Sequence, residues 1–186
     1  MHRCYSHLGR IGGLQPLSLG YGCLYNGTVA HELLHAAGFY HEHSRPDRDD
    51  YIDVFPENVI REFEFEFRTI QPRRILLMTA FDYNSVMLYG SDSFSRRPGL
   101  PTILKKDGSR LPDVYAKPGL SEIDITRINI LYNCTAPRSH MRLVLFNEKE
   151  GDHYRKKMDK KTSCLEIPLD CGSLKNKEEL AAVGIQ

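Results

Sequence analysis

Histidines recur at short intervals in residues 31–41, which read HELLHAAGFYH. His31 and His35 are four residues apart, so on a helix of 3.6 residues per turn they project about 40° from each other and can bind one ion together. His41 cannot join them on the same helix, because six further residues carry it roughly 9 Å along the axis. The helix must therefore end before His41. Gly38 lies in that interval, and glycine readily adopts the positive φ with which a chain turns back after a helix.

This spacing predicts a zinc site of the catalytic kind. Three imidazole ligands leave one position of a tetrahedral zinc ion open for water. Glu32 follows the first histidine, so its carboxylate lies beside the metal without having to bind it, as a general base requires. The alternative is an amphipathic core helix with solvated histidines. At the frequencies in this chain, with 8 His and 14 Gly in 186 residues, the pattern HExxHxxGxxH arises by chance on the order of 10⁻⁴ times, which favours the zinc site.

The longer run from His31 to Asp49 resembles the astacin family of metzincin zinc peptidases. After the zinc motif, the matching residues are Glu42, Arg45, Asp47, Arg48 and Asp49. Metzincins also carry a tight turn around a methionine beneath the zinc, and YNSVMLYG at residues 83–90 matches that turn. The resemblance implies that Met87 packs under the imidazoles and that Tyr89 approaches the zinc and stabilises the oxyanion. Leu88 stands where the family usually has histidine, and since that residue is not a ligand, we expect the change to affect packing more than chemistry.

The resemblance implies a zinc-dependent endopeptidase, a hydrolase that cleaves peptide bonds of protein substrates. One Zn²⁺ would be bound by the three histidines, and the catalytic residues would be Glu32 and Tyr89. In astacins an edge strand pairs with the extended substrate, so a protein or peptide substrate is expected along the stretch from Cys4 to Arg10.

Two other functions are considered. The first is a non-catalytic, truncated zinc- or peptide-binding fragment, which keeps the ligands without a folded cleft. The second is a purely structural zinc site, which would need a fourth protein ligand, and His43 is the nearest candidate. The structural site has less support, because it leaves Glu32 and Tyr89 without a purpose.

Composition argues against two classes of partner. The chain has 25 Lys and Arg against 24 Asp and Glu, a formal charge of +1, which provides no electrostatic footprint for nucleic acid or an anionic membrane surface. The longest apolar run is about residues 75–78, too short for a spanning helix or the core of a signal peptide. We therefore expect no membrane partner and no signal peptide in this chain, whereas the family resemblance implies a secreted, extracellular protein. The oligomeric state stays open.

The surrounding elements are expected to form an α+β fold. Polar and apolar residues alternate from Cys4 to about Leu19 around several glycines, which predicts a strand, a turn and a second strand. Ser121 is followed three residues later by Asp124, as in a capping box, and helical spacing of apolar residues continues toward Asn133. The resemblance implies a metzincin-like zinc peptidase. Its upper lobe would hold a partial twisted sheet and the active-site helix, and its irregular lower lobe would end in this C-terminal helix.

Three segments have two interpretations each. Residues 26–28 form a glycosylation sequon, Asn-Gly-Thr, but we expect them to cap the zinc helix, because a glycan there would crowd the site. Residues 44–51, SRPDRDDY, form either a solvated loop or a charged network that fixes the ligand loop, and the resemblance favours the network. In residues 61–70 phenylalanines alternate as in a strand, while the corresponding region of astacins is irregular and helical.

The chain is expected to consist of two parts. Residues 1–134 would form an astacin-like peptidase domain that lacks its N-terminal part, and residues 135–186 a C-terminal extension without assignment. The resemblance pairs Cys4 with Cys23, whereas the pairing of the other three cysteines, at positions 134, 164 and 171, stays open. It also matches Glu42 to a glutamate that meets the buried N-terminal amine in mature astacins. Here that carboxylate needs another partner or stays solvated.

Overall fold

The computed structural model describes residues 4–134 of the chain. Described residues up to Arg127 belong to one compact unit, and those from Ile128 on belong to a second unit. The extension at 135–186, with Cys164 and Cys171, lies outside the described residues, and so does any pairing of those cysteines. No helix in the described part of the chain is long and apolar enough to cross a membrane.

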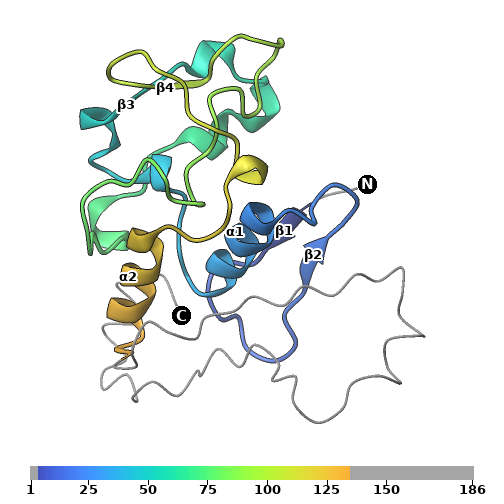
Figure 1. The fold of residues 1–186 in the computed structure, drawn as a ribbon, viewed down its shortest axis with the longest axis vertical. Helices are drawn as coiled ribbons and strands as arrows, with labels where there is room; N and C mark the ends of the chain where they lie inside the picture. Colours follow the sequence, from blue (N-terminus) through green and yellow to red (C-terminus); the bar gives the residue numbers. More distant parts are fainter. Residues whose placement is uncertain (1–3, 135–186) are drawn as a thin grey trace. The chain divides into compact units, whose positions relative to one another are not determined.

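A hairpin opens the described chain. Strand β1 (Cys4–Ser6) pairs antiparallel with β2 (Leu17–Leu19), with Cys4 opposite Leu19. This confirms the predicted strand, turn and strand. A disulfide joins Cys4 to Cys23, as the resemblance implied, and ties the hairpin to the chain that leads into helix α1 (Asn26–Ala36). Both strands pack against α1 (Figure 1).

The first turn of helix α1 packs closely against a neighbouring backbone segment and has no side-chain cap. Tyr25 holds the N-cap position in an extended conformation and makes no side-chain cap hydrogen bond, so the capping role expected for residues 26–28 is wrong. A Cβ atom on Gly27 would lie 2.1 Å from the carbonyl oxygen of Val114. Glycine is therefore required at this position because the first turn of α1 lies directly against the backbone of η6 (Val114–Ala116).

The end of α1 follows the prediction from the histidine spacing. The helix ends at Ala36, and Gly38 has a φ of 96°. Its amide donates to the carbonyl oxygen of His35 at 2.9 Å, and the amide of Phe39 donates to that of Leu34 at 3.0 Å. These two bonds satisfy carbonyls that the helix end leaves without partners, while the chain reverses toward His41.

The part of the fold after His41 is mostly irregular. Strand β3 (Ile52–Val54) pairs antiparallel with β4 (Ile103–Lys105), and short 3₁₀ helices connect the remaining turns. These are η1 (Glu42–Ser44), η2 (Arg48–Asp50), η3 (Pro56–Asn58), η4 (Arg61–Phe67) and η5 (Pro72–Arg74). The alternating phenylalanines therefore lie on a helix and not on a strand. A step of two residues spreads side chains over different faces of a helix with three residues per turn, so Phe67 is buried while Phe65 is 55% exposed.

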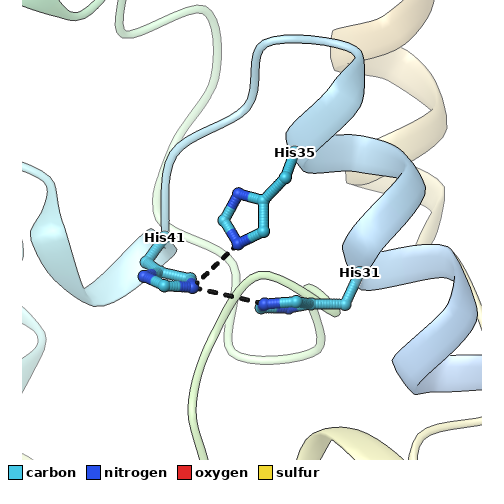
Figure 2. A group of neighbouring side chains, drawn as sticks. All are labelled: His31, His35 and His41. Atoms are coloured by element: carbon cyan, nitrogen blue, oxygen red, sulfur yellow. Dashed lines mark hydrogen bonds between the residues drawn. The ribbon is translucent and has the colours of Figure 1, made fainter. Parts of the chain in front are cut away.

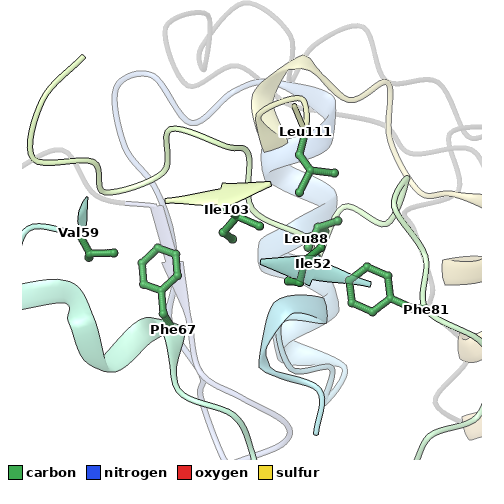
Figure 3. Packing of buried hydrophobic residues seen from close by; sticks show 7 residues of the cluster. All are labelled: Ile52, Val59, Phe67, Phe81, Leu88, Ile103 and Leu111. Carbon is green, nitrogen blue, oxygen red and sulfur yellow. The ribbon is translucent and has the colours of Figure 1, made fainter. Parts of the chain in front are cut away.

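The hydrophobic core lies around the β3–β4 pair (Figure 3). Its buried members are Ile52, Val59, Phe67, Phe81, Leu88, Ile103 and Leu111. Leu88 is fully buried in this cluster. Its side chain therefore belongs to the packing of the core.

Helix α2 (Glu122–Leu131) starts with the predicted capping box. The amide of Asp124 donates to Ser121 Oγ at 2.9 Å, and the amide of Ser121 donates to Asp124 Oδ2 at 3.1 Å. Ile125 and Ile128, whose spacing predicted the helix, are only partly buried, whereas Asp124, Arg127 and Leu131 are buried. The packed face of the first turns of α2 is charged, which has consequences for the site.

Candidate active site

Three histidine side chains converge on one point (Figure 2). His31 and His35 extend from α1, and His41 from the loop that follows Gly38. The Nε2 atom of His41 lies 3.0 Å from that of His35 and 3.2 Å from that of His31. A tetrahedral zinc ion with Zn–N bonds of about 2.0 to 2.1 Å holds its nitrogens about 3.3 Å apart. The three nitrogens are therefore spaced to bind one ion, and no other trio of His, Cys, Asp or Glu in residues 4–134 does so.

Backbone carbonyls set the orientation of two of these rings. His31 Nδ1 lies 2.7 Å from the carbonyl oxygen of Val86, and His35 Nδ1 lies 2.9 Å from that of Phe39. A carbonyl can only accept, so each Nδ1 carries the proton and each Nε2 presents its lone pair to the centre of the group. Metal-binding histidines in proteins are held in the same way.

Burial keeps the three imidazoles neutral. It lowers the pKa of His31 to about 3, with a further contribution from the neighbouring His35. Burial likewise lowers the pKa of His35 and, more strongly, that of His41. Only the neutral ring offers a lone pair to a metal, so these side chains are ready to bind without first losing protons at neutral pH.

Glu32 lies beside the histidines on α1 and is 5% exposed. Burial raises the pKa of its carboxyl to about 7, and its Oε2 atom has no hydrogen-bond partner within the protein. A buried carboxylate oxygen without a donor is costly, so this atom fits a site where a proton or a polar ligand arrives from outside. A carboxyl that titrates near neutral pH is suited to accept and return a proton.

The predicted methionine turn packs against the histidine group. Met87 is 1% exposed, and its carbonyl oxygen accepts the amide of Glu42 at 2.8 Å. The ring of Tyr89 lies 4.4 Å from that of His41, between centroids. Burial raises the pKa of Tyr89 above its ordinary value, and the negative charges of Glu66 and Glu32 raise it further. Its hydroxyl therefore stays protonated and keeps its capacity to donate a hydrogen bond.

His43 also lies in this group of rings but does not join the other histidines. Its ring stacks on His41 at 5.0 Å and contacts Tyr89 at 4.2 Å, between centroids. The Nε2 atom of His43 lies 3.1 Å from the carbonyl oxygen of Glu66. His43 is thus placed to support the ring of Tyr89, and the structure does not bring it in as the fourth ligand that a structural zinc site requires.

A buried network of charges fixes the loop that carries His41. Glu42 is 3% exposed. Its two oxygens accept from both terminal nitrogens of Arg127, each at 2.7 Å, and one of them also accepts from Arg45 at 3.2 Å. Arg45 also contacts Asp47 at 2.8 Å, and Arg48 donates to the carbonyl of His43 at 2.9 Å. Arg45, Asp47 and Arg48 of segment 44–51 therefore take part in a charged network, as predicted, and do not form a solvated loop.

Arg127 is the functional residue that sequence reasoning missed. Glu42 was expected either to have another partner or to stay solvated, and Arg127 on α2 is its partner. One signal was present, because Asp124 and Arg127 are three residues apart and so share a helix face.

A family model described as "Astacin", a peptidase family, matches residues 1–133. High choriolytic enzyme 1 of Oryzias latipes is 45% identical over 132 residues, which cover 70% of this chain and 48% of that protein. Zinc metalloproteinase nas-13 of Caenorhabditis elegans is 46% identical over 132 residues, or 70% of this chain and 29% of that protein. Meprin A subunit alpha of Mus musculus is 41% identical over 134 residues, which cover 72% of this chain and 18% of that protein. The chain thus spans about half or less of each relative.

The fold is also similar to a solved structure. High choriolytic enzyme 1, a hatching enzyme zinc-protease from Oryzias latipes, matches with a TM-score of 0.65 at 44% identity. The match covers 71% of this chain and 65% of that chain. It confirms the expected α+β, metzincin-like fold.

Proposed function

Because the chain belongs to the astacin family of peptidases, we propose that it is a zinc-dependent endopeptidase that hydrolyses peptide bonds of protein substrates. The proposed peptidase domain comprises residues 1–134, with residues 135–186 proposed as a C-terminal extension without assignment. One observation supports this function most directly. Three histidine Nε2 atoms converge on one point next to a buried Glu32 oxygen that has no partner within the protein.

The proposed roles follow from these positions. His31, His35 and His41 would hold Zn²⁺, which would supply Lewis-acid polarisation of the scissile carbonyl and of the attacking water. Glu32 accepts the proton of the attacking water at its unpartnered oxygen and then passes it to the leaving amine. Tyr89 donates its hydroxyl proton in a hydrogen bond to the substrate oxygen as that oxygen gains negative charge.

We place the substrate along the stretch from Cys4 to Arg10. Among the described residues β1 pairs with β2 alone, so its other edge is open to an extended peptide. The amide of Gly9 donates to the carbonyl oxygen of His35 at 2.8 Å. This bond keeps the end of the stretch beside the zinc helix, so that a peptide paired with it would run past the histidines.

We also propose that the protein works outside the cell. The disulfide between Cys4 and Cys23 supports this location, because such bonds persist in oxidising compartments and are rare in the cytosol.

The experiment measures zinc content and proteolysis on the same sample. The purified full chain is assayed for cleavage of an unfolded protein, with and without a chelator. Glu32→Gln is the catalytic variant, because it preserves the size of the side chain and removes its basicity. Glu122→Gln on α2 is the matched control, with the same chemical change at an exposed position. We expect chelator-sensitive cleavage that is lost in Glu32→Gln and retained in the control. A folded, zinc-loaded protein without cleavage would instead indicate a non-catalytic zinc- or peptide-binding module.

A further inference from the structure

The turn at residues 85–88 is held by two buried charged side chains that the proposed reaction does not use. Lys117 is 5% exposed, and its Nζ atom donates to the carbonyl oxygens of Ser85 and Leu88 at 2.6 and 2.7 Å. Asp124 is 1% exposed. Its Oδ1 accepts the hydroxyl of Ser85 at 2.6 Å, and its Oδ2 accepts the amide of Val86 at 3.0 Å. Lys117 thus holds two carbonyl oxygens of the turn, and Asp124 holds one hydroxyl and one amide of the same turn.

A continuous chain of hydrogen bonds runs from Asp124 to a metal-site histidine. Ser85 donates to Asp124 and accepts the amide of Met87 at 3.1 Å. That amide belongs to the same peptide group as the carbonyl of Val86, which accepts His31 Nδ1–H at 2.7 Å. Three hydrogen bonds, all donated in the same direction, therefore join four groups, with the carboxylate of Asp124 at one end and the imidazole of His31 at the other.

We propose that Asp124 and Ser85 are positioning residues for His31 and set the affinity of the site for zinc. The charge of Asp124 polarises the Ser85 hydroxyl, which in turn polarises the peptide group between Val86 and Met87. The carbonyl of that group becomes a stronger acceptor for the His31 ring, which fixes the tautomer and makes the opposite nitrogen a better metal ligand. This inference rests on the proposed zinc site and is independent of whether the protein cleaves peptides.

A simple loss of stability has to be separated from this effect, because Asp124 also belongs to the capping box of α2. The chain offers a matched pair of serines for this purpose. Ser85 and Ser121 both hydrogen-bond to Asp124 through their hydroxyls. Only Ser85 connects Asp124 to the peptide group that holds His31, whereas Ser121 caps the helix and contacts Asp82 at 2.5 Å.

The experiment compares Ser85→Ala with Ser121→Ala in the full chain, using competition with a chromophoric chelator to measure the zinc dissociation constant. Loss of an outer partner of a metal ligand typically weakens metal binding about 10- to 100-fold. We expect this weakening for Ser85→Ala and a change of less than about twofold for Ser121→Ala. Both variants should unfold at a lower denaturant concentration than the wild type.

Two further measurements keep the test decisive if Ser85→Ala does not fold. Asp124→Asn keeps the shape of the side chain and removes its charge, and we expect it to weaken zinc binding about tenfold. Histidine ¹⁵N shifts of the metal-free variants report whether the His31 proton has left Nδ1. Equal zinc affinities for wild type, Ser85→Ala and Asp124→Asn would overturn the proposal while leaving the zinc site intact. A wild-type chain that binds no zinc would overturn both.

Discussion

Arg127 donates from both terminal nitrogens of its guanidinium to the two carboxylate oxygens of Glu42, at 2.7 Å each. The two residues are 85 positions apart in the sequence, and Glu42 directly follows the metal-site residue His41. This buried pair therefore connects helix α2 to the loop that carries the third histidine. Its geometry leads to the first prediction.

Arg127→Gln should destabilise the protein strongly. Removing one partner of a buried ion pair leaves an uncompensated charge and typically costs about 3 to 5 kcal/mol. Arg45 and the amide of Asp82 still donate to Glu42, so we expect about 3 kcal/mol, the lower end of that range. Urea unfolding measures the loss. The control is Arg110→Gln, which breaks an ion pair with Asp92 that is nearly half exposed and should leave the midpoint almost unchanged. Equal shifts in the two variants would show that burial is not the cause.

Gly27→Ala should destabilise the start of α1 despite the higher helix propensity of alanine. The added Cβ would lie 2.1 Å from the carbonyl oxygen of Val114 and 2.8 Å from that of Lys117. Backbone has to shift to relieve these contacts, and overpacking of this kind costs about 1 to 3 kcal/mol. Thermal unfolding measures the change, with Asn26→Ala as the exposed neighbouring control. A Gly27→Ala protein that melts at or above the wild-type temperature would contradict the close packing of α1 on η6.

Leu88→Ala should lower stability without releasing zinc. Leu88 is fully buried in the core around β3 and β4, and truncation of a buried leucine typically costs about 2 to 5 kcal/mol. Its side chain packs into that core and is not one of the three metal-site residues. Chemical unfolding and zinc content, measured on the same preparation, test both parts. Loss of zinc at temperatures where the variant is still folded would mean that this position acts on the site directly.

The stability of the metal-free protein should depend on pH through Glu32. Burial raises the pKa of its carboxyl from 4.5 to about 7 in the folded protein. Between these two values the folded state keeps a proton that the unfolded state has lost. The contribution of Glu32 to stability is therefore fully present below pH 4.5 and is lost as the pH rises toward 7. The neighbouring His31, whose pKa burial lowers to about 3, has the opposite dependence, with stability lost as pH falls below 6.5.

A comparison of wild type with Glu32→Gln isolates the carboxyl from the histidines. Glutamine does not titrate, so the variant should gain stability relative to wild type as the pH rises from 4.5 to 7. Denaturant unfolding at several pH values, in the presence of chelator, measures this difference. A difference that is the same at every pH would show that the pKa of Glu32 is not raised by folding.

Features that depend on neighbours in the sequence could be predicted, and features that depend on distant contacts could not. The spacing of His31, His35 and His41 determines which side chains meet, and Gly38 supplies the backbone freedom that the turn needs. The capping box at Ser121 and Asp124 is equally local. By contrast, Gly27 is explained by the carbonyl of Val114, which lies far along the chain. No pattern near residue 26 could have distinguished that contact from a cap.

Helix α2 shows the same limit for the candidate site. Isoleucine spacing predicted the helix correctly, but the buried first turns present Asp124 and Arg127 to the protein interior. Their partners are Ser85, Val86 and Glu42. Burial of a charge becomes favourable only when a partner charge or a set of donors is brought to it by tertiary structure. That information is not contained in the periodicity of the helix.

The zinc stoichiometry of single histidine variants tests the open three-histidine site most directly. The metal content of wild type is compared with that of His31→Ala, His35→Ala, His41→Ala and His43→Ala, each after dialysis against a weak chelator. We predict one zinc ion per wild-type chain, loss of zinc in the first three variants, and retention in His43→Ala, because His43 Nε2 contacts the carbonyl of Glu66 and not the converging nitrogens. Zinc lost equally from His43→Ala, or retained in His41→Ala, would contradict the proposed site.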